Sequence, residues 1–437
     1  MNPIKETKSP KPFQLPPEFF WGAATSSHQV EGGNRFSDWW EWEEKRIVKT
    51  PSRDACQHYE HFDSDFELAK SLGHNAHRFS IEWSRLEPKK KQWNEKEFAH
   101  YDAVLSALIK RKIEPVVTLH HFTLPAWLAA EGGFENPRMI DYFGYYARKV
   151  VEAFGSKVTY WVTINEPMVF LFKGYLVGEW PPGLRSSRRA LKVLRNLMLA
   201  HIRGYQTVHH YAQSHRGVKK PMVGFAQHVG RFSPCSPGSW RDRLSTWLRQ
   251  FFSNHLILKA LHSGFLFFPG IYCEPLPVRR SFDFLGLNYY TRHFVHFKNF
   301  EFPGILGDEC NLEHHKTAGP RNDMGWEIYP KGLFDLLLEM RQYQVPIFVL
   351  ENGICTSDDD ARKEFIRRHL MEVAHSIEKH VPAIGYLYWS LLDNFEWEHG
   401  FTPRFGLVEV DYQTQERRIR DSARYFSEIC RTGIVPV

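Results

Sequence analysis

The sequence has little that would place this protein in a membrane or outside a cell. No stretch of its 437 residues approaches the run of about 18 apolar residues that suggests a membrane-spanning helix. The segment from Met1 to Pro12 is polar, carries several Lys and Pro residues, and lacks the apolar centre of a signal peptide. We therefore expect a cytoplasmic protein in which residues 1–12 form a flexible tail.

Cysteine is also scarce, and its spacing matches no common metal site. The six cysteines are far apart in the sequence, without a CxxC pair or a zinc-finger spacing, and no HExxH motif is present. In a chain of this length, reduced thiols are more consistent with this pattern than a disulfide framework. We expect neither a metal nor a cofactor. The cysteines are Cys56, Cys235, Cys273, Cys310, Cys355 and Cys430.

The charge pattern and the aromatic content indicate which kinds of molecule this protein binds. The net charge is +6, and the basic clusters Lys89–Lys91 and Arg185–Arg195 do not alternate with aromatic residues as nucleic-acid sites do. We interpret them as solvated helix faces and expect no nucleic-acid partner. Phe, Trp and Tyr make up 15% of the chain. Most of these rings suit core packing, and some offer flat surfaces on which sugars stack.

Apolar runs of strand length alternate with longer amphipathic stretches, which is typical of parallel βα units. The predicted strands are 19–24, 75–81, 114–120, 160–164, 222–227, 282–287, 346–350 and 383–389. The predicted helices are 63–72, 98–111, 139–154, 191–215, 332–343 and 362–380.

Eight such strands predict an α/β fold, a single (β/α)8 TIM barrel with elaborated βα loops over residues 13–437. An open doubly wound sheet is the alternative, but it would need a glycine-rich phosphate turn after the first strand. Residues 21–26, WGAATS, are not such a turn. No repeat or low-complexity linker marks a further domain boundary.

Polar residues follow directly after seven of the eight predicted strands. In barrel enzymes the carboxyl ends of the strands carry the active site. Seven polar clusters on one face therefore predict a site there. The clusters are 26–31, Arg78, 120–121, 165–166, 288–290, 351–352 and 389–397.

Two of these clusters place a Glu beside an Asn at the end of a strand. They are TINEP, containing Glu166, and LENG, containing Glu351. A lone Glu at such a position is commonly a loop carboxylate or a helix N-cap. Two on one barrel face, after the fourth and seventh strands, instead suit glycoside hydrolysis, which uses a pair of carboxyl groups flanking the scissile bond.

The motifs taken together resemble glycoside hydrolase family 1, the β-glucosidase family. TINEP, LENG and YWSLLDNFEW occur in that order, and the resemblance runs from Phe13 to about Pro436. Further matching segments are FFWGAATSSHQVEG, HRFSIEWSR, HHFTLP, FLGLNYYT, DMGWEIYPKGL and RFGLVEVDY. The resemblance implies a (β/α)8 barrel that hydrolyses β-glycosides with retention of configuration through a covalent glycosyl-enzyme.

The resemblance also assigns a role to each matching residue. Glu166 corresponds to the acid/base and Glu351 to the nucleophile. Arg78 and Tyr290 match positions that bond the nucleophile, Asn165 matches the ligand of the sugar 2-hydroxyl, and Asn288 lines the site. Substrate binding would fall to Gln29, His121, Trp389, Glu396, Trp397 and Phe405.

Glu396 bears on the substrate. In phospho-β-glycosidases of the family a small residue takes its place, and a carboxylate would repel a 6-phosphate. We therefore expect unphosphorylated β-D-glucosides, with β-D-galactosides and β-D-fucosides as further substrates.

The chain departs from the family pattern at three places. Phe122 stands where many members have Trp, Leu350 replaces the common Thr before the nucleophile, and the segment 261–283 is short. We expect the short segment to open the side of the site that holds the leaving group. Two other readings stay open: a β-glycosidase that mainly transglycosylates, and an inactive sugar-binding barrel. The preferred sugar, the leaving group and the oligomeric state are not determined by the sequence.

Overall fold

Short runs of buried apolar residues form the central strands of the protein, because parallel strands covered on both faces are apolar throughout their length. The computed structural model describes residues 12–45, 50–268 and 272–437. The predicted tail lies outside these residues except for Pro12. The central strands are β2 (Phe20–Ala24), β3 (Ala76–Ser80), β4 (Glu114–His120), β5 (Tyr160–Asn165), β6 (Met222–Pro234), β9 (Leu285–His296), β11 (Ile347–Asn352) and β12 (Ala383–Trp389).

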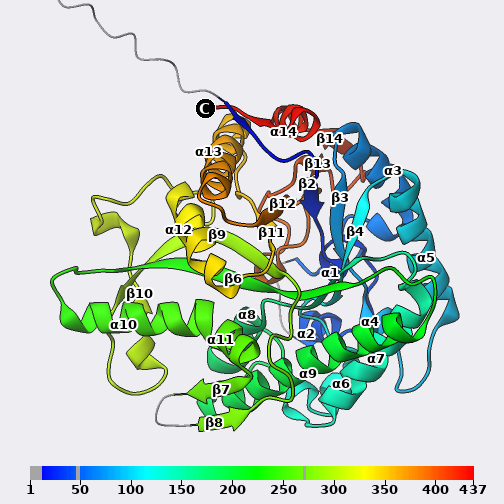
Figure 1. Cartoon of the computed structure of the whole chain (residues 1–437), viewed down its shortest axis with the longest axis horizontal. Coiled ribbons are helices and arrows are strands. Elements are labelled where there is room, and N and C mark those ends of the chain that lie inside the picture. Colours follow the sequence, from blue (N-terminus) through cyan, green and yellow to red (C-terminus); the bar gives the residue numbers. More distant parts are fainter. Residues whose placement is uncertain (1–11, 46–49, 269–271) are drawn as a thin grey trace, which may run out of the picture.

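Within the described residues these eight parallel strands close into a barrel (Figure 1). Each strand pairs with the next in chain order, and β12 pairs with β2, as in the register of Tyr386 with Trp21. The strands β6 and β9 close the remaining gap, with Ala226 opposite Gly286. The predicted (β/α)8 barrel is therefore confirmed.

Two predicted strands were placed too short or too early. The strand predicted at 222–227 continues to Pro234, and the one predicted at 282–287 begins at Leu285 and continues to His296. Beyond the barrel these two strands remain paired, up to Pro234 opposite Val295. The short strand β10 (Asp308–Glu309) adds to β9 on its other side. Their outer parts contain Gly230 and several polar residues, so the apolar run that predicts a strand stops early.

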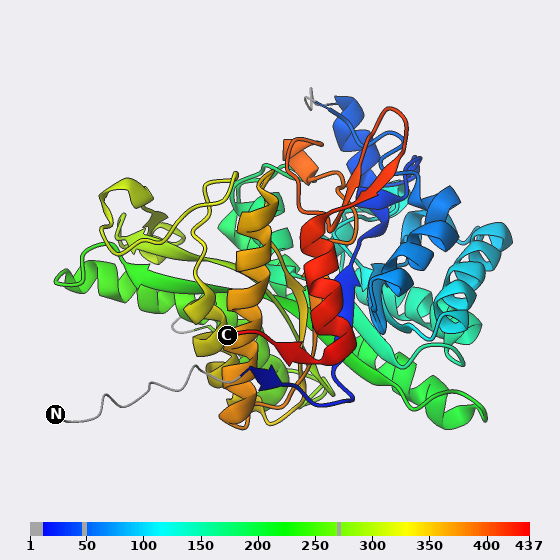
Figure 2. The same ribbon diagram turned by 90° about the horizontal axis from the view of Figure 1, so that it is seen from above.

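Helices cover the barrel and fill its longer loops (Figure 2). The helix α7 (Met139–Phe154) shows the pattern clearly, since Phe143, Tyr146, Val150 and Phe154 are buried at helical spacing. The other helices are α1 (Ser27–Val30), α2 (Asp38–Lys45), α3 (His58–Ser71), α4 (Trp83–Leu86), α5 (Glu95–Lys110), α6 (Ala126–Ala130), α8 (Pro167–Leu171), α9 (Ser187–Ser214), α10 (Trp240–Gln250), α11 (Leu256–Ser263), α12 (Pro330–Met340), α13 (Asp359–Glu378) and α14 (Asp421–Thr432).

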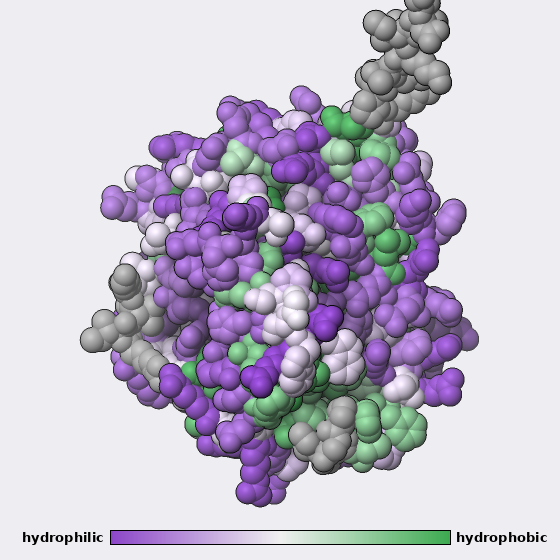
Figure 3. All heavy atoms as spheres, turned by 90° about the vertical axis from the view of Figure 1, so that its left-hand side faces the viewer, coloured by the Kyte–Doolittle hydropathy of each residue, from purple (hydrophilic) through white to green (hydrophobic). Residues whose placement is uncertain are grey.

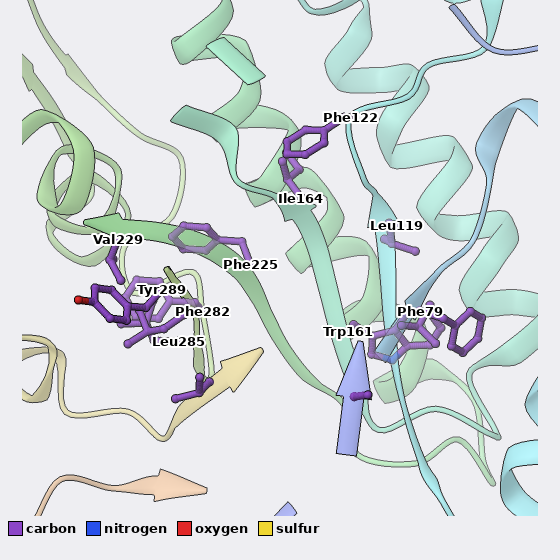
Figure 4. Close-up of a cluster of buried hydrophobic side chains, with 14 of the residues drawn as sticks. Phe79, Leu119, Phe122, Trp161, Ile164, Phe225, Val229, Phe282, Leu285 and Tyr289 are labelled. Atoms are coloured by element: carbon purple, nitrogen blue, oxygen red, sulfur yellow. The ribbon is translucent and has the colours of Figure 1, made fainter. Parts of the chain in front are cut away.

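Buried apolar side chains form two clusters, one on each face of the barrel sheet. Inside the barrel, small and branched residues such as Ala76, Val116 and Val162 pack against Phe284 and Phe348. Outside it, alternate residues of the same strands pack against the helices; Figure 4 shows part of this cluster. Its labelled members include Leu119, Trp161, Phe225, Leu285 and Tyr289. The strands are thereby fixed on both faces, which holds their ends in place.

The remaining strands lie at the periphery. They are β1 (Phe13–Gln14), which pairs with β15 (Ile434–Val435), the hairpin of β7 (Phe265–Phe268) and β8 (Tyr272–Pro275), and the pair β13 (Val408–Val410) and β14 (Arg417–Ile419). Figure 3 shows a mainly hydrophilic face, with apolar side chains gathered near its lower edge. Among the described residues, no helix is both long and apolar enough to cross a membrane.

Candidate active site

A cavity of about 1490 Å³ opens at the carboxyl ends of the barrel strands. Nine of the twelve predicted site residues line it, and each lies in a barrel strand or in the segment that follows one. The other three, Arg78, Asn165 and Asn288, are buried. Arg78 donates to Glu351 and Asn288 donates to Glu166, while Asn165 accepts hydrogen bonds from both Arg78 and Asn288. The nine that line it are Gln29, His121, Glu166, Tyr290, Glu351, Trp389, Glu396, Trp397 and Phe405.

Glu351 lies in β11, one residue before the strand ends, and both of its carboxyl oxygens have a donor. Arg78 Nη1 donates to Oε1 at 2.5 Å, and the Tyr290 hydroxyl donates to Oε2 at 2.7 Å. The strand β12 passes very close to this turn. A Cβ on Gly353 would lie 1.9 Å from the carbonyl oxygen of Trp389, so only glycine fits two residues after Glu351.

Glu166 follows β5 and begins helix α8, with Pro167 in the first turn. Its φ of 44° lies in the left-handed region, which is strained for a residue with a Cβ and is frequent at functional sites. Its Oε1 accepts a hydrogen bond from Asn288 Nδ2 at 2.8 Å and lies 3.4 Å from His228 Nδ1. Glu166 and Glu351 therefore have separate partners. Those of Glu166 are a neutral amide and a titratable imidazole, whereas those of Glu351 include the permanent cation of Arg78.

Asn165 connects the two carboxyl groups through shared partners. Its Oδ1 accepts from Arg78 Nη2 at 2.7 Å and from Asn288 Nδ2 at 3.1 Å, while its Nδ2 lies 3.3 Å from His121 Nε2. These contacts fix the orientation of the amide, because its oxygen accepts from two donors and its nitrogen faces a ring nitrogen. Rotation of Asn165 would break contacts that involve both Glu residues.

The electrostatic environment couples the two carboxyl groups. Burial raises the pKa of Glu351 to about 7; the Arg78 guanidinium opposes the rise, and the nearby Glu166 carboxylate adds to it. Of the two residues, Glu351 has the Arg78 guanidinium as a direct donor, and this contact favours its ionised form.

The predicted sugar-binding residues form a group of aromatic rings and polar tips. The His121 ring stacks against Trp389 and Trp397, with centroids 6.0 and 6.3 Å away. Gln29 Nε2 donates to the Phe395 carbonyl at 2.8 Å and approaches Glu396 Oε2 at 3.4 Å. Burial, with Glu398 and the two central Glu residues nearby, raises the pKa of Glu396 to about 8. At neutral pH Glu396 is therefore mostly an uncharged acid that both donates and accepts.

His228 and Thr118 belong to this site and were missing from the sequence prediction. His228 belongs to β6, the fifth barrel strand, whose predicted end was the only one without a recognised polar cluster. Its position directly after the predicted run 222–227 was an available signal. Thr118 accepts a hydrogen bond from Arg78 Nε at 3.0 Å, but a Thr inside an apolar strand gives no sign of such a role.

Comparison with known proteins identifies the family of this chain. The model of glycosyl hydrolase family 1 matches residues 11–269 and 272–434. The β-glucosidase A of Thermotoga maritima is 32% identical over 96% of this chain and 98% of its own, and the β-galactosidase of Pyrococcus woesei is 32% identical over 95% and 96%. The structure of a β-glycosidase from Pyrococcus horikoshii superposes with a TM-score of 0.90, at 40% identity, covering 98% of this chain and 97% of that one. The chain therefore belongs to glycosyl hydrolase family 1 and is a glycoside hydrolase.

Proposed function

We propose that this enzyme hydrolyses unphosphorylated β-D-glycosides by double displacement, with Glu351 as nucleophile and Glu166 as acid/base. The observation that carries the proposal is the difference between the partners of the two buried carboxyl groups. Glu351 is bonded by a guanidinium and a phenol, which favour its anion. Glu166 is bonded by an amide and an imidazole, which can accompany it in either protonation state.

The reaction follows from this arrangement. Glu351 attacks the anomeric carbon while Glu166 gives its proton to the leaving oxygen, which yields a glycosyl ester and a free alcohol. After this step Glu351 is an ester and Glu166 is a carboxylate, so Glu166 is the member of the pair that can act as a base. Glu166 then takes the proton of the incoming water. The water attacks the ester, releases the sugar with its original configuration, and the cycle closes.

Sugar recognition would use the group around Glu396. We propose that Gln29, His121 and Glu396 bind the hydroxyls of the terminal sugar, with Trp389 as the stacking surface. Because Glu396 is mostly protonated at pH 7, it offers both a donor and an acceptor to adjacent hydroxyls. A 6-phosphate would be disfavoured by the anionic charge shared among the central carboxyl groups, more than by Glu396 alone.

Two variants test the assignment of roles. Glu351→Ala should abolish turnover, and azide should restore it with an inverted glycosyl azide as product. Glu166→Ala should spare dinitrophenyl β-glucoside, whose leaving group needs no proton, while poor leaving groups lose about 10²–10⁴-fold in kcat. Equal loss of every substrate in both variants would contradict the roles.

Two assays distinguish a hydrolase from an inactive sugar-binding barrel and from a transglycosylase. An inactive sugar-binding barrel would bind nitrophenyl glucoside without releasing nitrophenol. A transglycosylase would transfer the sugar to an added alcohol in preference to water, and product analysis measures that ratio. We propose hydrolysis because both Glu residues and their bonded partners are present in one cavity. A panel of nitrophenyl β-glucoside, β-galactoside, β-fucoside and 6-phospho-β-glucoside then ranks the sugars by kcat/KM.

A further inference from the structure

The fold brings together two cysteines and two histidines that the sequence keeps apart. Cys235 follows β6, while Cys310, His314 and His315 follow β10. One potential ligand atom from each of the four residues lies within 4.8 Å of every other. The Sγ atoms of Cys235 and Cys310 are 3.2 Å apart, and His314 Nε2 lies 3.3 and 3.1 Å from them. From the sequence we expected reduced thiols and no metal, because the cysteines are far apart in the chain.

We propose that Cys235, Cys310, His314 and His315 form a structural zinc site. Two thiolates and two imidazoles are the donor set of tetrahedral zinc centres, whereas calcium and magnesium require oxygen ligands. Zinc–sulfur bonds of about 2.3 Å and zinc–nitrogen bonds of about 2.0–2.1 Å separate tetrahedral donors by about 3.3–3.8 Å. The distances among the two Sγ atoms and His314 Nε2 are slightly shorter, so each donor moves only a few tenths of an ångström to admit the ion.

His315 gives an independent indication of a missing partner. Its Nε2 is buried and has no hydrogen-bond partner within the part of the chain that the structure describes. Its ring is held in place, stacked on Phe294 of β9 with centroids 3.8 Å apart and close to His314 at 4.2 Å. A buried ring nitrogen without a partner is costly, and coordination to a cation would satisfy it.

The backbone positions these ligands before any ion binds. Cys235 N donates to the carbonyl of Val295, and Cys310 N donates to that of Phe294, both at 2.8 Å. The two cysteines therefore pair with opposite edges of β9, and their Sγ atoms lie 3.2 Å apart. Cys310 and His314 are separated by one turn of chain, which ends in the short helix Leu312–His314. Cys235 and Cys310, which belong to different connections between barrel strands, are 75 residues apart in the sequence.

The site would anchor the wall of the active-site cavity. Residues 297–329, between β9 and α12, contribute Phe302, Leu306 and Glu309 to the cavity lining. In Figures 1 and 2 this segment and α10 lie at the left margin, away from the barrel. A tetrahedral ion that joins this segment to the end of β6 would restrict its motion. Zinc binding should therefore protect the segment against local opening.

Metal content is the first test. The full chain, produced in zinc-containing medium and purified with reductant and without chelator, should retain close to one zinc per chain. Cys235→Ser and Cys310→Ser should each retain less than about a tenth of that amount, since loss of a thiolate weakens a structural zinc site strongly. Cys273→Ser is the matched control, because Cys273 is exposed and lies outside the cluster. Equal zinc in all four proteins would overturn the proposal.

Cobalt gives a second test that does not depend on the folding of a cysteine variant. Cobalt added to the metal-free, reduced wild-type chain should produce the intense visible bands of tetrahedral coordination and a thiolate charge-transfer band, both saturating at one equivalent. One equivalent of zinc should remove them. His314→Ala should lose the tetrahedral bands, and His210→Ala, an exposed histidine of α9, should keep them.

Limited proteolysis connects the site to its segment. Lys316 is exposed two residues after His314, and zinc should slow tryptic cleavage there at least about fivefold in the wild type and not in Cys310→Ser. Two results would overturn the proposal. One is a reduced wild-type chain that binds neither zinc nor cobalt. The other is a disulfide between Cys235 and Cys310 that dissolved oxygen forms as fast with zinc present as without it.

Discussion

Replacing Tyr290 by Phe removes one hydroxyl group from the proposed nucleophile and leaves the rest of the site in place. The Tyr290 ring packs beside Trp326 and Phe405, with centroids 5.7 and 6.3 Å away, and Phe keeps these contacts. Burial and the Glu351 carboxylate raise the pKa of Tyr290 well above its usual value. The hydroxyl therefore stays protonated and donates to Glu351 throughout the working pH range.

The size of the effect follows from the bond that is lost. A hydrogen bond to a charged group contributes about 1.5–3 kcal/mol, and about 1.4 kcal/mol corresponds to one pKa unit. Loss of this donor destabilises only the ionised form of Glu351. Its pKa should rise by about 1–2 units from its value of about 7.

The assay is the pH dependence of kcat/KM for nitrophenyl β-glucoside, because this ratio reports groups of the free enzyme. Since Glu351 must be ionised to attack, activity is lost as the pH falls through its pKa. The acidic limb of Tyr290→Phe should therefore move upward by about 1–2 units, and kcat/KM at pH 6 should fall about 10–100-fold.

A neighbouring tyrosine provides the matched control. Tyr289 donates its hydroxyl to the Tyr329 carbonyl at 2.6 Å, on the other face of β9, and does not contact Glu351. Tyr289→Phe should cost stability and leave the acidic limb unchanged. A uniform loss of activity in Tyr290→Phe with an unmoved limb, or an equal shift in both variants, would refute the role given to Tyr290.

Three further predictions concern His228, Glu396 and the short segment 261–283. Burial lowers the pKa of His228, but the hydrogen bond and charge of Glu166 raise it overall. His228 can therefore carry a positive charge beside Glu166, and His228→Asn, which removes that charge, should move the basic limb of the pH–rate profile upward by about 1 unit. A downward shift would contradict the contact. The pKa of Glu396 is raised to about 8, so at pH 6.5 Glu396→Gln should lose less than about 10-fold in kcat/KM and Glu396→Ala about 10²–10³-fold. The Gln variant should differ further from the wild type above pH 8, where Glu396 ionises. Identical losses in both variants would exclude the hydroxyl contact. The short segment 261–283 contains the β7–β8 hairpin, which contributes Phe268 to the cavity. If this segment opens the site, kcat/KM for aryl glucosides should vary less than about 10-fold between nitrophenyl and naphthyl leaving groups. Rejection of the bulky leaving groups by more than 100-fold would show that the segment does not open the site.

The sequence was sufficient to predict the bounds of a strand or helix where a single apolar or amphipathic run forms that element. The strands β4 and β12 and the helix α7 have the predicted bounds, because each is a single apolar or amphipathic run with clear ends. The extensions of β6 and β9 were not predicted, since their outer parts are stabilised by pairing with each other and not by an apolar pattern of their own.

The candidate site shows the same division. The sequence by itself determined the two Glu residues after the fourth and seventh strands, and the resemblance supplied Arg78, Tyr290 and Asn165. Only the tertiary structure decided that Asn165 links both carboxyl groups, that Glu396 is mostly protonated at neutral pH, and that His228 contacts Glu166. Burial and through-space charge set these properties, and neither is a property of neighbouring residues in the chain.

The cysteine–histidine cluster is the clearest case of information that the sequence does not display. Cys235 and Cys310 are 75 residues apart, and each belongs to a different connection of the barrel. They meet because β9 lies between the strands that precede them, an arrangement fixed by barrel closure through the β6–β9 pairing. The sequence thus determined which strands form and which residues follow them, while the closure of the barrel decided which of those residues share a site.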